Sequence, residues 1–161
     1  MREIYIGIDN GVSGSIGILG APEGARFFRT PIHKERSYTK DEKHISRLDV
    51  PAFRKMVAGF PKDTLVLLER PMVNPQRFAA SMSAMRAMEA TLIVLEENDY
   101  FLRYVDSKEW QSALLPKIVG SDELKAASLA KGGELYPALK TKFKSDADSL
   151  LIAHWAKAAD L

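Results

Sequence analysis

The most constraining feature of this chain is a continuous apolar run that ends at an acidic residue. Residues 64–68 read TLVLL, and Glu69 follows directly. Such a run is typical of a β-strand that is covered on both faces, as in the sheets of α/β proteins. The rest of the chain must therefore supply helices for two faces of a sheet. An acid at the end of a buried strand must also be paired, solvated or bound to a cation.

Four further segments predict the other strands of this sheet. Residues 3–9 are rich in β-branched and aromatic side chains and run through Asp9 into an Asn-Gly turn. Residues 15–19 and 25–30 follow closely enough to form an antiparallel meander with the first strand. Residues 101–105 predict the last strand. We therefore expect a mixed five-stranded sheet.

The segments between and after these strands carry helical signals. Asp49 and Ser121 are predicted N-caps, because each precedes a helical pattern. The predicted helices run from Asp49 to near Gly59, over 77–97, around Trp110, over 121–135 and from about 146 to 159. This order of strands and helices predicts an α/β fold, with the five-stranded sheet flanked by helices.

The most polar part of the chain lies between the third strand and the first helix. Residues 34–43 contain four basic and three acidic side chains and show no apolar periodicity. We expect a long surface loop here, of the kind that is often functional.

Length and composition limit the classes of protein that this chain can belong to. A chain of 161 residues fits one domain, so residues 1–161 are expected to form a single domain. The absence of cysteine excludes disulfides, thiolate metal sites and a cysteine nucleophile. The net charge of +2 is too near balance to indicate a polyanionic partner by itself. No stretch approaches ~18 consecutive apolar residues and no signal sequence is visible, so we expect a soluble cytoplasmic protein without a membrane partner.

Acidic residues stand at three matching places in this order of elements. Asp9 ends the first strand, Glu69 ends the fourth, and Asp146 and Asp148 stand at the start of the last helix. Carboxylate oxygens suit Mg²⁺ or Mn²⁺, and a carboxylate cluster can bind two ions about 4 Å apart. Each acid also has an ordinary interpretation: a turn at Asp9, a surface ion pair with Arg70 at Glu69, and favourable helix-terminal charges at the other two.

Four segments carry a resemblance to a known family. They are residues 6–11 (IGIDNG) with Gly14 and Gly17, residues 67–69 (LLE), a middle segment with Val105, Asp106, Trp110, Gln111, Lys125 and residues 135–137 (LYP), and residues 146–153 (DADSLLIA). In these features, and over nearly its full length, the chain resembles the RuvC-type Holliday junction resolvases of the RNase H-like nuclease superfamily. The similarity is to their phage-encoded and poxviral members in particular.

The resemblance implies an RNase H-like fold in which Asp9, Glu69, Asp146 and Asp148 are catalytic residues and metal ligands. The chain departs from the family at the last two acids, which the family often spaces three or four residues apart and this chain spaces by two. On a regular helix this spacing separates two side chains by roughly 200°, so both acids can join one site only if Asp146 precedes the first helical turn. We therefore favour Asp148 as the last ligand. A capping box between Ser145 and Asp148 is the ordinary alternative.

Basic and aromatic residues near these acids are candidate DNA contacts. Lys125 is similar to a family lysine near the scissile phosphate, and Arg70, Arg77 and Phe78 belong to the region after Glu69 that the family uses to contact DNA. A second group would share one face of an extended segment and form a phosphate-binding row: Lys140, Lys142 and Lys144. The alternatives are a solvated surface for each lysine and core or dimer packing for Phe78.

The resemblance implies a hydrolase of phosphodiester bonds, specifically a crossover junction endodeoxyribonuclease of DNA recombination and repair. It would act on four-way junction DNA as a homodimer, with two Mg²⁺ ions per active site and Mn²⁺ able to substitute. Met82, Met85 and Met88 are at helical spacing and predict core or dimer packing. The alternatives are another RNase H-like nuclease that acts on RNA:DNA hybrids or flaps, or a non-catalytic module that binds junctions or nucleotides.

Overall fold

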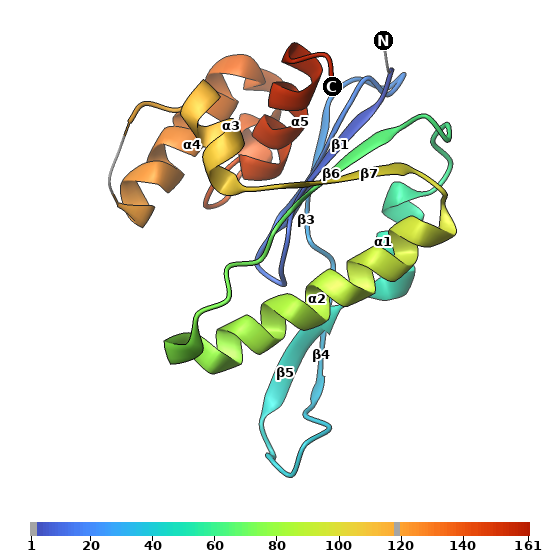
Figure 1. The fold of residues 1–161 in the computed structure, drawn as a ribbon, viewed down its shortest axis with the longest axis vertical. Coiled ribbons are helices and arrows are strands. Elements are labelled where there is room, and N and C mark those ends of the chain that lie inside the picture. Colours follow the sequence, from blue (N-terminus) through green and yellow to red (C-terminus); the bar gives the residue numbers. More distant parts are fainter. Residues whose placement is uncertain (1–2, 118–119) are drawn as a thin grey trace.

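The computed structural model describes residues 3–117 and 120–161 (Figure 1). Its strands are β1 (Tyr5–Asp9), β2 (Ser15–Leu19), β3 (Arg26–Arg29), β4 (Ile32–Arg36), β5 (His44–Leu48), β6 (Leu65–Glu69) and β7 (Phe101–Val105). Its α-helices are α1 (Val50–Val57), α2 (Phe78–Glu97), α3 (Ser107–Leu114), α4 (Ser121–Leu135) and α5 (Asp148–Ala158). Two 3₁₀ helices, η1 (Pro75–Arg77) and η2 (Pro137–Lys142), complete the elements.

The central sheet has five strands in the order β3-β2-β1-β6-β7. Strand β1 pairs antiparallel with β2 and parallel with β6, and β6 pairs parallel with β7. The predicted mixed five-stranded sheet and its opening antiparallel meander are therefore confirmed. Because β1 and β6 are parallel neighbours, their acidic carboxyl ends lie at the same edge of the sheet.

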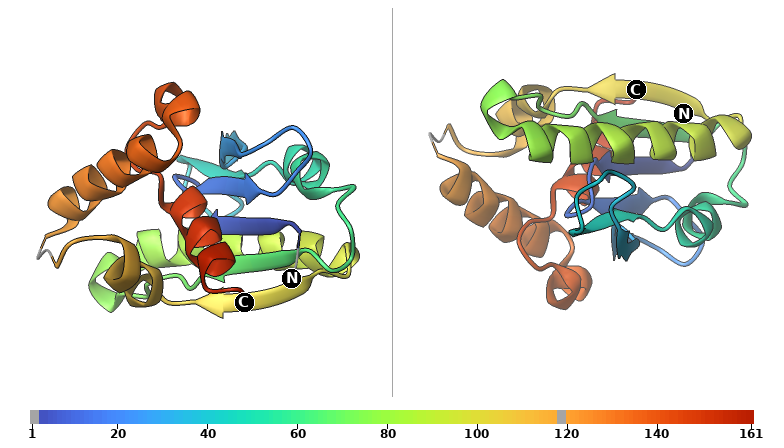
Figure 2. Two further views of the ribbon diagram at one scale, coloured as in Figure 1. Left: turned by 90° about the horizontal axis from the view of Figure 1, so that it is seen from above. Right: turned by 90° about the horizontal axis from the view of Figure 1, so that it is seen from below.

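Helices cover both faces of this sheet, as the apolar run of β6 requires. Alternate residues of the strands point to opposite faces, so Tyr5 and Leu67 pack with α3 and α5 while Ile6 and Leu68 pack with α1 and α2. Figure 2 shows α5 on one face and α2 on the other. The acidic ends of β1 and β6 thus emerge from a core that is sealed on both sides.

The helix boundaries agree with the prediction except at the start of the last helix, and one of the two predicted N-caps is wrong. The Asp49 side chain accepts a hydrogen bond from the Ala52 backbone N–H at 3.0 Å, which confirms its predicted role as an N-cap. The prediction for Ser121 is wrong, because this residue is already helical and Gly120 is the N-cap with φ +135°, where a side chain would be strained. The last helix begins at Asp148, two residues later than expected.

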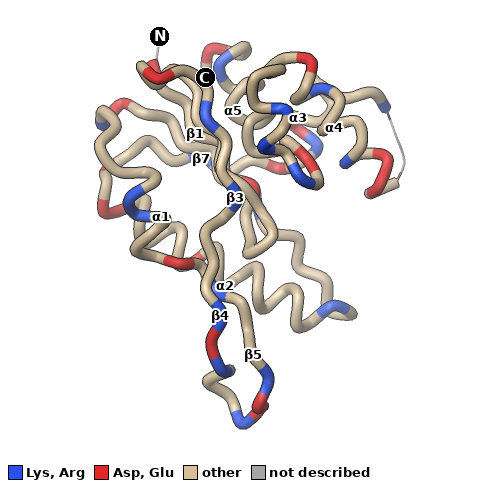
Figure 3. Tube along the Cα trace, turned by 180° about the vertical axis from the view of Figure 1, so that it is seen from behind, with Lys and Arg blue, Asp and Glu red and all other residues tan. Residues whose placement is uncertain are grey.

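The expected surface loop at residues 34–43 is confirmed for residues 37–43, which form an exposed loop, and is wrong for residues 34–36, which belong to a strand. Strands β4 and β5 form a separate two-stranded hairpin that extends away from the sheet beyond α2 (Figure 1). Ion pairs stabilise it, with Glu35 2.8 Å from Arg47 and Arg36 3.1 Å from Glu42. Both charge signs are visible along this hairpin in Figure 3. Its pairing joins residues up to 16 positions apart, as for Ile32 and Leu48, and hydrophobic periodicity does not detect such contacts.

Helix α2 has two different faces. Its buried side packs on the sheet through residues such as Met88, Val94 and Leu95. Its exposed side carries Phe78, Met82, Met85 and Ile93, with 70, 44, 45 and 50% exposure. By length and composition, residues 75–97 are apolar enough to cross a membrane, a test that core helices of soluble proteins also pass. In this structure the helix lies against the sheet.

Candidate metal centre

Two of the four predicted acids are brought together by strand pairing. Ile8 of β1 is opposite Leu68 of β6, so the next residues, Asp9 and Glu69, meet where the two parallel strands end. Asp9 is also opposite Ser15 of β2. Both carboxyl groups are therefore held by the most central part of the sheet.

The close approach of α5 brings the other two acids to the same place. Gly7 and Gly17 are opposite each other in the β1–β2 pair and lie beneath the start of α5. A Cβ on Gly7 would collide with the Ser149 backbone oxygen, and one on Gly17 would lie 2.5 Å from the Leu150 Cα. Only glycine at these positions lets the helix approach so closely.

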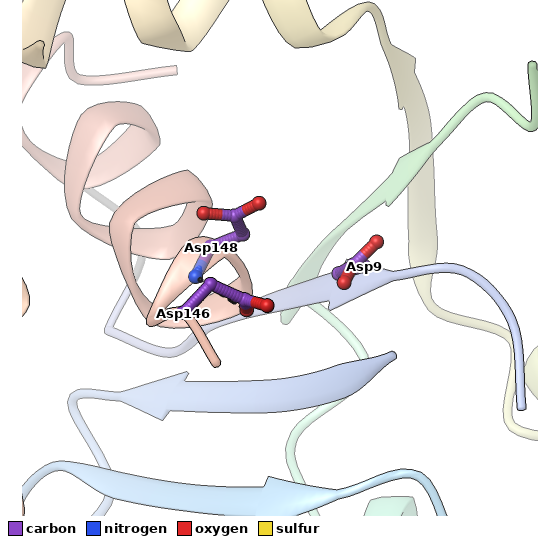
Figure 4. Close-up of side chains that lie close together, drawn as sticks. All are labelled: Asp9, Asp146 and Asp148. Atoms are coloured by element: carbon purple, nitrogen blue, oxygen red, sulfur yellow. Dashed lines mark hydrogen bonds between the residues drawn. The ribbon is translucent and has the colours of Figure 1, made fainter. Parts of the chain in front are cut away.

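Asp9, Asp146 and Asp148 form a carboxylate cluster, drawn in Figure 4. Each supplies one oxygen, and these oxygens all lie within 4.8 Å of one another. Asp146 precedes the first residue of α5, which is the condition under which both late acids can face one site. Asp146 is buried, with 5% exposure. Its carboxylate is part of the cluster together with that of Asp148, the acid that the sequence analysis favoured.

The local hydrogen bonds explain why the helix begins after Asp146. The Ser145 hydroxyl donates to Asp146 Oδ2 at 2.7 Å, and the Asp148 backbone N–H donates to Asp146 Oδ1 at 3.4 Å. Asp146 thus occupies a turn that leads into the helix. The alternative of a Ser145–Asp148 capping box is wrong, because the N-cap position belongs to Ala147 and no side chain caps the helix.

Burial and repulsion by neighbouring acids raise the pKa values of Asp9, Glu69 and Asp148. Burial raises the pKa of Asp9 well above its ordinary value, and Glu69, Asp148 and Asp146 raise it further. Burial raises the pKa of Asp148 to about 7, although the Ser128 hydroxyl and Lys125 oppose the shift. The pKa of Glu69 is raised by burial, against hydrogen bonds that lower it from Trp110 and Asp9. These three carboxyl groups therefore keep their protons to a higher pH than free carboxyl groups do, and a bound cation would displace those protons.

The chemistry of the donors fits a hard divalent cation. The cluster offers carboxylate oxygens, which Mg²⁺ and Mn²⁺ prefer, and the described residues near it offer no cysteine sulfur. A cation would also offset the cost of placing several carboxylates close together in a buried setting. Asp9, Asp146 and Asp148 are the residues that would bind it, with Glu69 next to Asp9.

The ordinary interpretation of Glu69 as a surface ion pair does not describe its environment. Its neighbour Arg70 instead pairs with Asp106, at 3.1 Å, and lies over the ring of Tyr104. Glu69 Oε1 accepts a hydrogen bond from the indole Nε1–H of Trp110 at 3.1 Å.

The predicted DNA contacts fall into two groups. Lys125 is exposed on α4, three residues before Ser128, which donates to Asp148 Oδ1, and its charge lowers the pKa of Asp148. Arg77 and Phe78 are exposed where η1 passes into α2, and the exposure of Phe78 excludes packing in the core of this chain. Among the methionines at helical spacing, Met88 packs in the core, and Met82 and Met85 are exposed.

The predicted extended row of lysines is wrong. Lys140 and Lys142 belong to the 3₁₀ helix η2, where residues two apart are turned by roughly 240° rather than sharing a face. Lys140, Lys142 and Lys144 are all exposed, so each remains a separate candidate contact.

Sequence reasoning missed three residues that organise the site. Ser128 of α4 donates a hydrogen bond to Asp148 Oδ1 and accepts one from the Ala147 backbone N–H at 3.0 Å. Arg29 donates to the Ser145 hydroxyl at 3.4 Å and to the Ser13 backbone oxygen at 2.6 Å. Trp110 entered the resemblance but not the predicted site. No local pattern marks these residues, because their partners lie far away in the chain.

Solved structures match this fold, and two of them are RuvC proteins. One is described as T. thermophilus RuvC in complex with Holliday junction substrate, with 16% sequence identity, a TM-score of 0.62, and coverage of 99% of this chain and 95% of that one. The other is a Thermus thermophilus RuvC structure, with 14% identity, a TM-score of 0.53, and coverage of 98% and 96%. The chain therefore has the RuvC-like, RNase H-like α/β fold that was predicted. No protein-family model and no curated protein matches the sequence.

Proposed function

We propose that this chain is a metal-dependent endonuclease that resolves four-way DNA junctions, a crossover junction endodeoxyribonuclease of DNA recombination and repair. The proposal treats residues 1–161 as one soluble cytoplasmic nuclease domain of the phage-encoded RuvC type. Its catalytic residues would be Asp9, Glu69, Asp146 and Asp148.

One observation carries the proposal: buried carboxylates converge at one sheet edge in a chain with the fold of RuvC. The oxygens of Asp9, Asp146 and Asp148 within 4.8 Å of one another support metal binding. The solved RuvC structure with a Holliday junction supports junction DNA as the substrate class. The fold alone would serve many activities, so the argument depends on this site.

The four acids would bind two Mg²⁺ ions, which Mn²⁺ could replace. Such ions supply an activated water and stabilise the charge that develops on a phosphodiester under in-line attack. The strand ends hold Asp9 and Glu69, and the turn before α5 holds Asp146 and Asp148. Lys125, whose charge lowers the pKa of Asp148, is exposed and would contact the phosphate backbone.

A homodimer is proposed through the exposed face of α2. Phe78, Met82, Met85 and Ile93 recur at intervals of about one or two helical turns and are all exposed. These four side chains form an exposed apolar stripe, interrupted by the exposed Glu89 between Met85 and Ile93, and exposed apolar surface of this kind marks an interaction surface. A two-fold dimer would present two sites in symmetric positions, and paired nicks would follow from that geometry.

The test is cleavage of a labelled four-way junction beside linear duplex, flap and RNA:DNA hybrid substrates, with Mg²⁺, Mn²⁺ or EDTA. We expect metal-dependent paired nicks in the junction alone. Asp9→Asn should abolish cleavage and spare junction binding. The matched control is Asp99→Asn, the same change at the opposite end of the sheet, where φ is +57° and asparagine is well tolerated.

The other outcomes discriminate between the alternatives. Cleavage of the hybrid or the flap in place of the junction would keep the metal site and replace the substrate. Binding of junctions without cleavage of any substrate would favour a non-catalytic module. Normal cleavage by Asp9→Asn would refute the proposed site.

A further inference from the structure

We propose, on the basis of the proposed metal site, that Trp110 is a positioning residue whose indole N–H orients the Glu69 carboxylate for cation binding. Trp110 does not lie among the three clustered aspartates. It would act through Glu69, as a hydrogen-bond donor from α3 to the end of β6.

The contact joins a buried indole to a half-buried carboxylate from a distant part of the chain. Trp110 has 0% exposure and is among the largest fully buried side chains. Its Nε1–H donates to Glu69 Oε1 at 3.1 Å, across 41 residues of sequence. A hydrogen bond to a carboxylate is stronger than one to a neutral acceptor, and a buried donor that loses its acceptor is costly.

Packing alone does not explain a tryptophan at this position. Apart from Tyr5, the other buried side chains of its cluster, including Leu67, Val105 and Leu151, are hydrocarbon, and phenylalanine would suit them without a polar atom. Indole adds one donor, and that donor meets the carboxylate of a proposed ligand. Residues that hydrogen-bond to metal ligands set the orientation of those ligands.

The backbone around Trp110 is held in place by two further contacts. The Asp106 backbone N–H donates to Glu109 Oε1 at 2.9 Å, as part of a capping box that starts α3. Asp106 also pairs with Arg70, the residue after Glu69, at 3.1 Å. These contacts join the start of α3 to the residue that follows β6.

The hydrogen bond assigns different roles to the two oxygens of Glu69. Oε1 accepts from the indole, which leaves Oε2 as the oxygen for a cation or for Asp9. Without the indole, the carboxylate could rotate about its last side-chain bond. We therefore expect Trp110→Phe to weaken metal binding more than it disturbs the fold.

The test measures Mn²⁺ affinity directly, from the electron paramagnetic resonance signal of the free ion. Four proteins are compared: the parent, Trp110→Phe, Leu115→Ala and Trp155→Phe. Leu115 belongs to the same core cluster as Trp110, so Leu115→Ala controls for general core damage. Trp155 lies in contact with Arg103 and controls for the loss of a tryptophan. We expect affinity to fall about 10- to 100-fold in Trp110→Phe and to change little in the controls.

A second measurement needs no change at Trp110. In ¹⁵N-labelled Trp155→Phe protein the remaining indole resonance belongs to Trp110. We expect Mg²⁺ to shift it, because the ion would bind the carboxylate that accepts this hydrogen bond. An indole resonance that stays unchanged under saturating Mg²⁺ would overturn the inference, even if Trp110→Phe failed to fold.

The outcomes separate this inference from the proposed function. If the parent binds Mn²⁺ and Trp110→Phe binds it equally well, Trp110 has no positioning role and the metal site stands. If Leu115→Ala loses as much affinity as Trp110→Phe, the effect is core damage and the inference is wrong. If the parent does not bind Mn²⁺, the proposed metal site fails and the inference fails with it.

Discussion

Asp148→Asn should stabilise the metal-free protein against unfolding at alkaline pH. The Asp148 carboxyl is half-buried beside other acids, and its removal from solvent raises its pKa to about 7. Asparagine has nearly the same shape and can still accept the hydrogen bond from Ser128. The substitution therefore removes a charge and leaves the packing almost unchanged.

The sign and size of the effect follow from proton linkage. The unfolded carboxyl loses its proton near pH 3.9, whereas the folded carboxyl keeps it until about pH 7. The folded state binds more protons in this window, so its stability falls as pH rises. Between about pH 5 and about pH 8, Asp148 should remove about 2 kcal/mol of unfolding free energy, after a discount for partial exposure.

The assay is urea unfolding of the parent and of Asp148→Asn in EDTA, at both ends of this pH range. His154 has a lowered pKa and stabilises the fold as pH rises, which opposes the effect of Asp148. The difference between the two proteins cancels this contribution, because both contain His154. We expect Asp148→Asn to gain about 2 kcal/mol relative to the parent as pH rises to about 8.

Excess Mg²⁺ provides the complementary measurement. Since a ligand that binds only the folded state stabilises it, Mg²⁺ should restore the parent at about pH 8 and have little effect on Asp148→Asn. Equal pH dependence in the two proteins would refute the argument from burial. Stabilisation of both proteins by Mg²⁺ to the same extent would show that Asp148 is not a ligand.

Three further substitutions test other parts of the structure. Gly17→Ala places a Cβ 2.5 Å from the Leu150 Cα, so it should move α5, weaken Mn²⁺ binding and cost about 1 to 3 kcal/mol in thermal unfolding; an unchanged melting temperature would contradict the close packing. Ser128→Ala leaves the buried Ala147 N–H without its acceptor and should cost about 1 to 3 kcal/mol in urea unfolding, whereas Ser112→Ala on the exposed side of α3 should cost far less. Met85→Glu places a charge in the exposed apolar stripe of α2 and should shift sedimentation from dimer to monomer without lowering the melting temperature; a parent that is already monomeric would refute the proposed interface.

Local patterns were sufficient to predict most elements of this fold. The apolar run before Glu69 predicted a strand covered on both faces, and β6 is such a strand. The Asp49 N-cap and the long helix over 77–97 were also visible in the sequence, because capping and helical composition depend on residues within a few positions of each other. The parallel pairing of β1 and β6, which the structure shows and the sequence analysis did not predict, accounts for the meeting of Asp9 and Glu69.

The sequence alone therefore determined the α/β class, the strand order at the start of the chain and the four acids as candidates. Only the tertiary structure decided which acids form a cluster. The segment before α5 and the close approach of this helix at Gly7 and Gly17 bring Asp146 and Asp148 next to Asp9. It also decided the β4–β5 hairpin and the hydrogen bond from Trp110. The physical reason is that these features depend on contacts between residues up to 139 positions apart, as for Asp9 and Asp148, and a local pattern contains no information about such contacts.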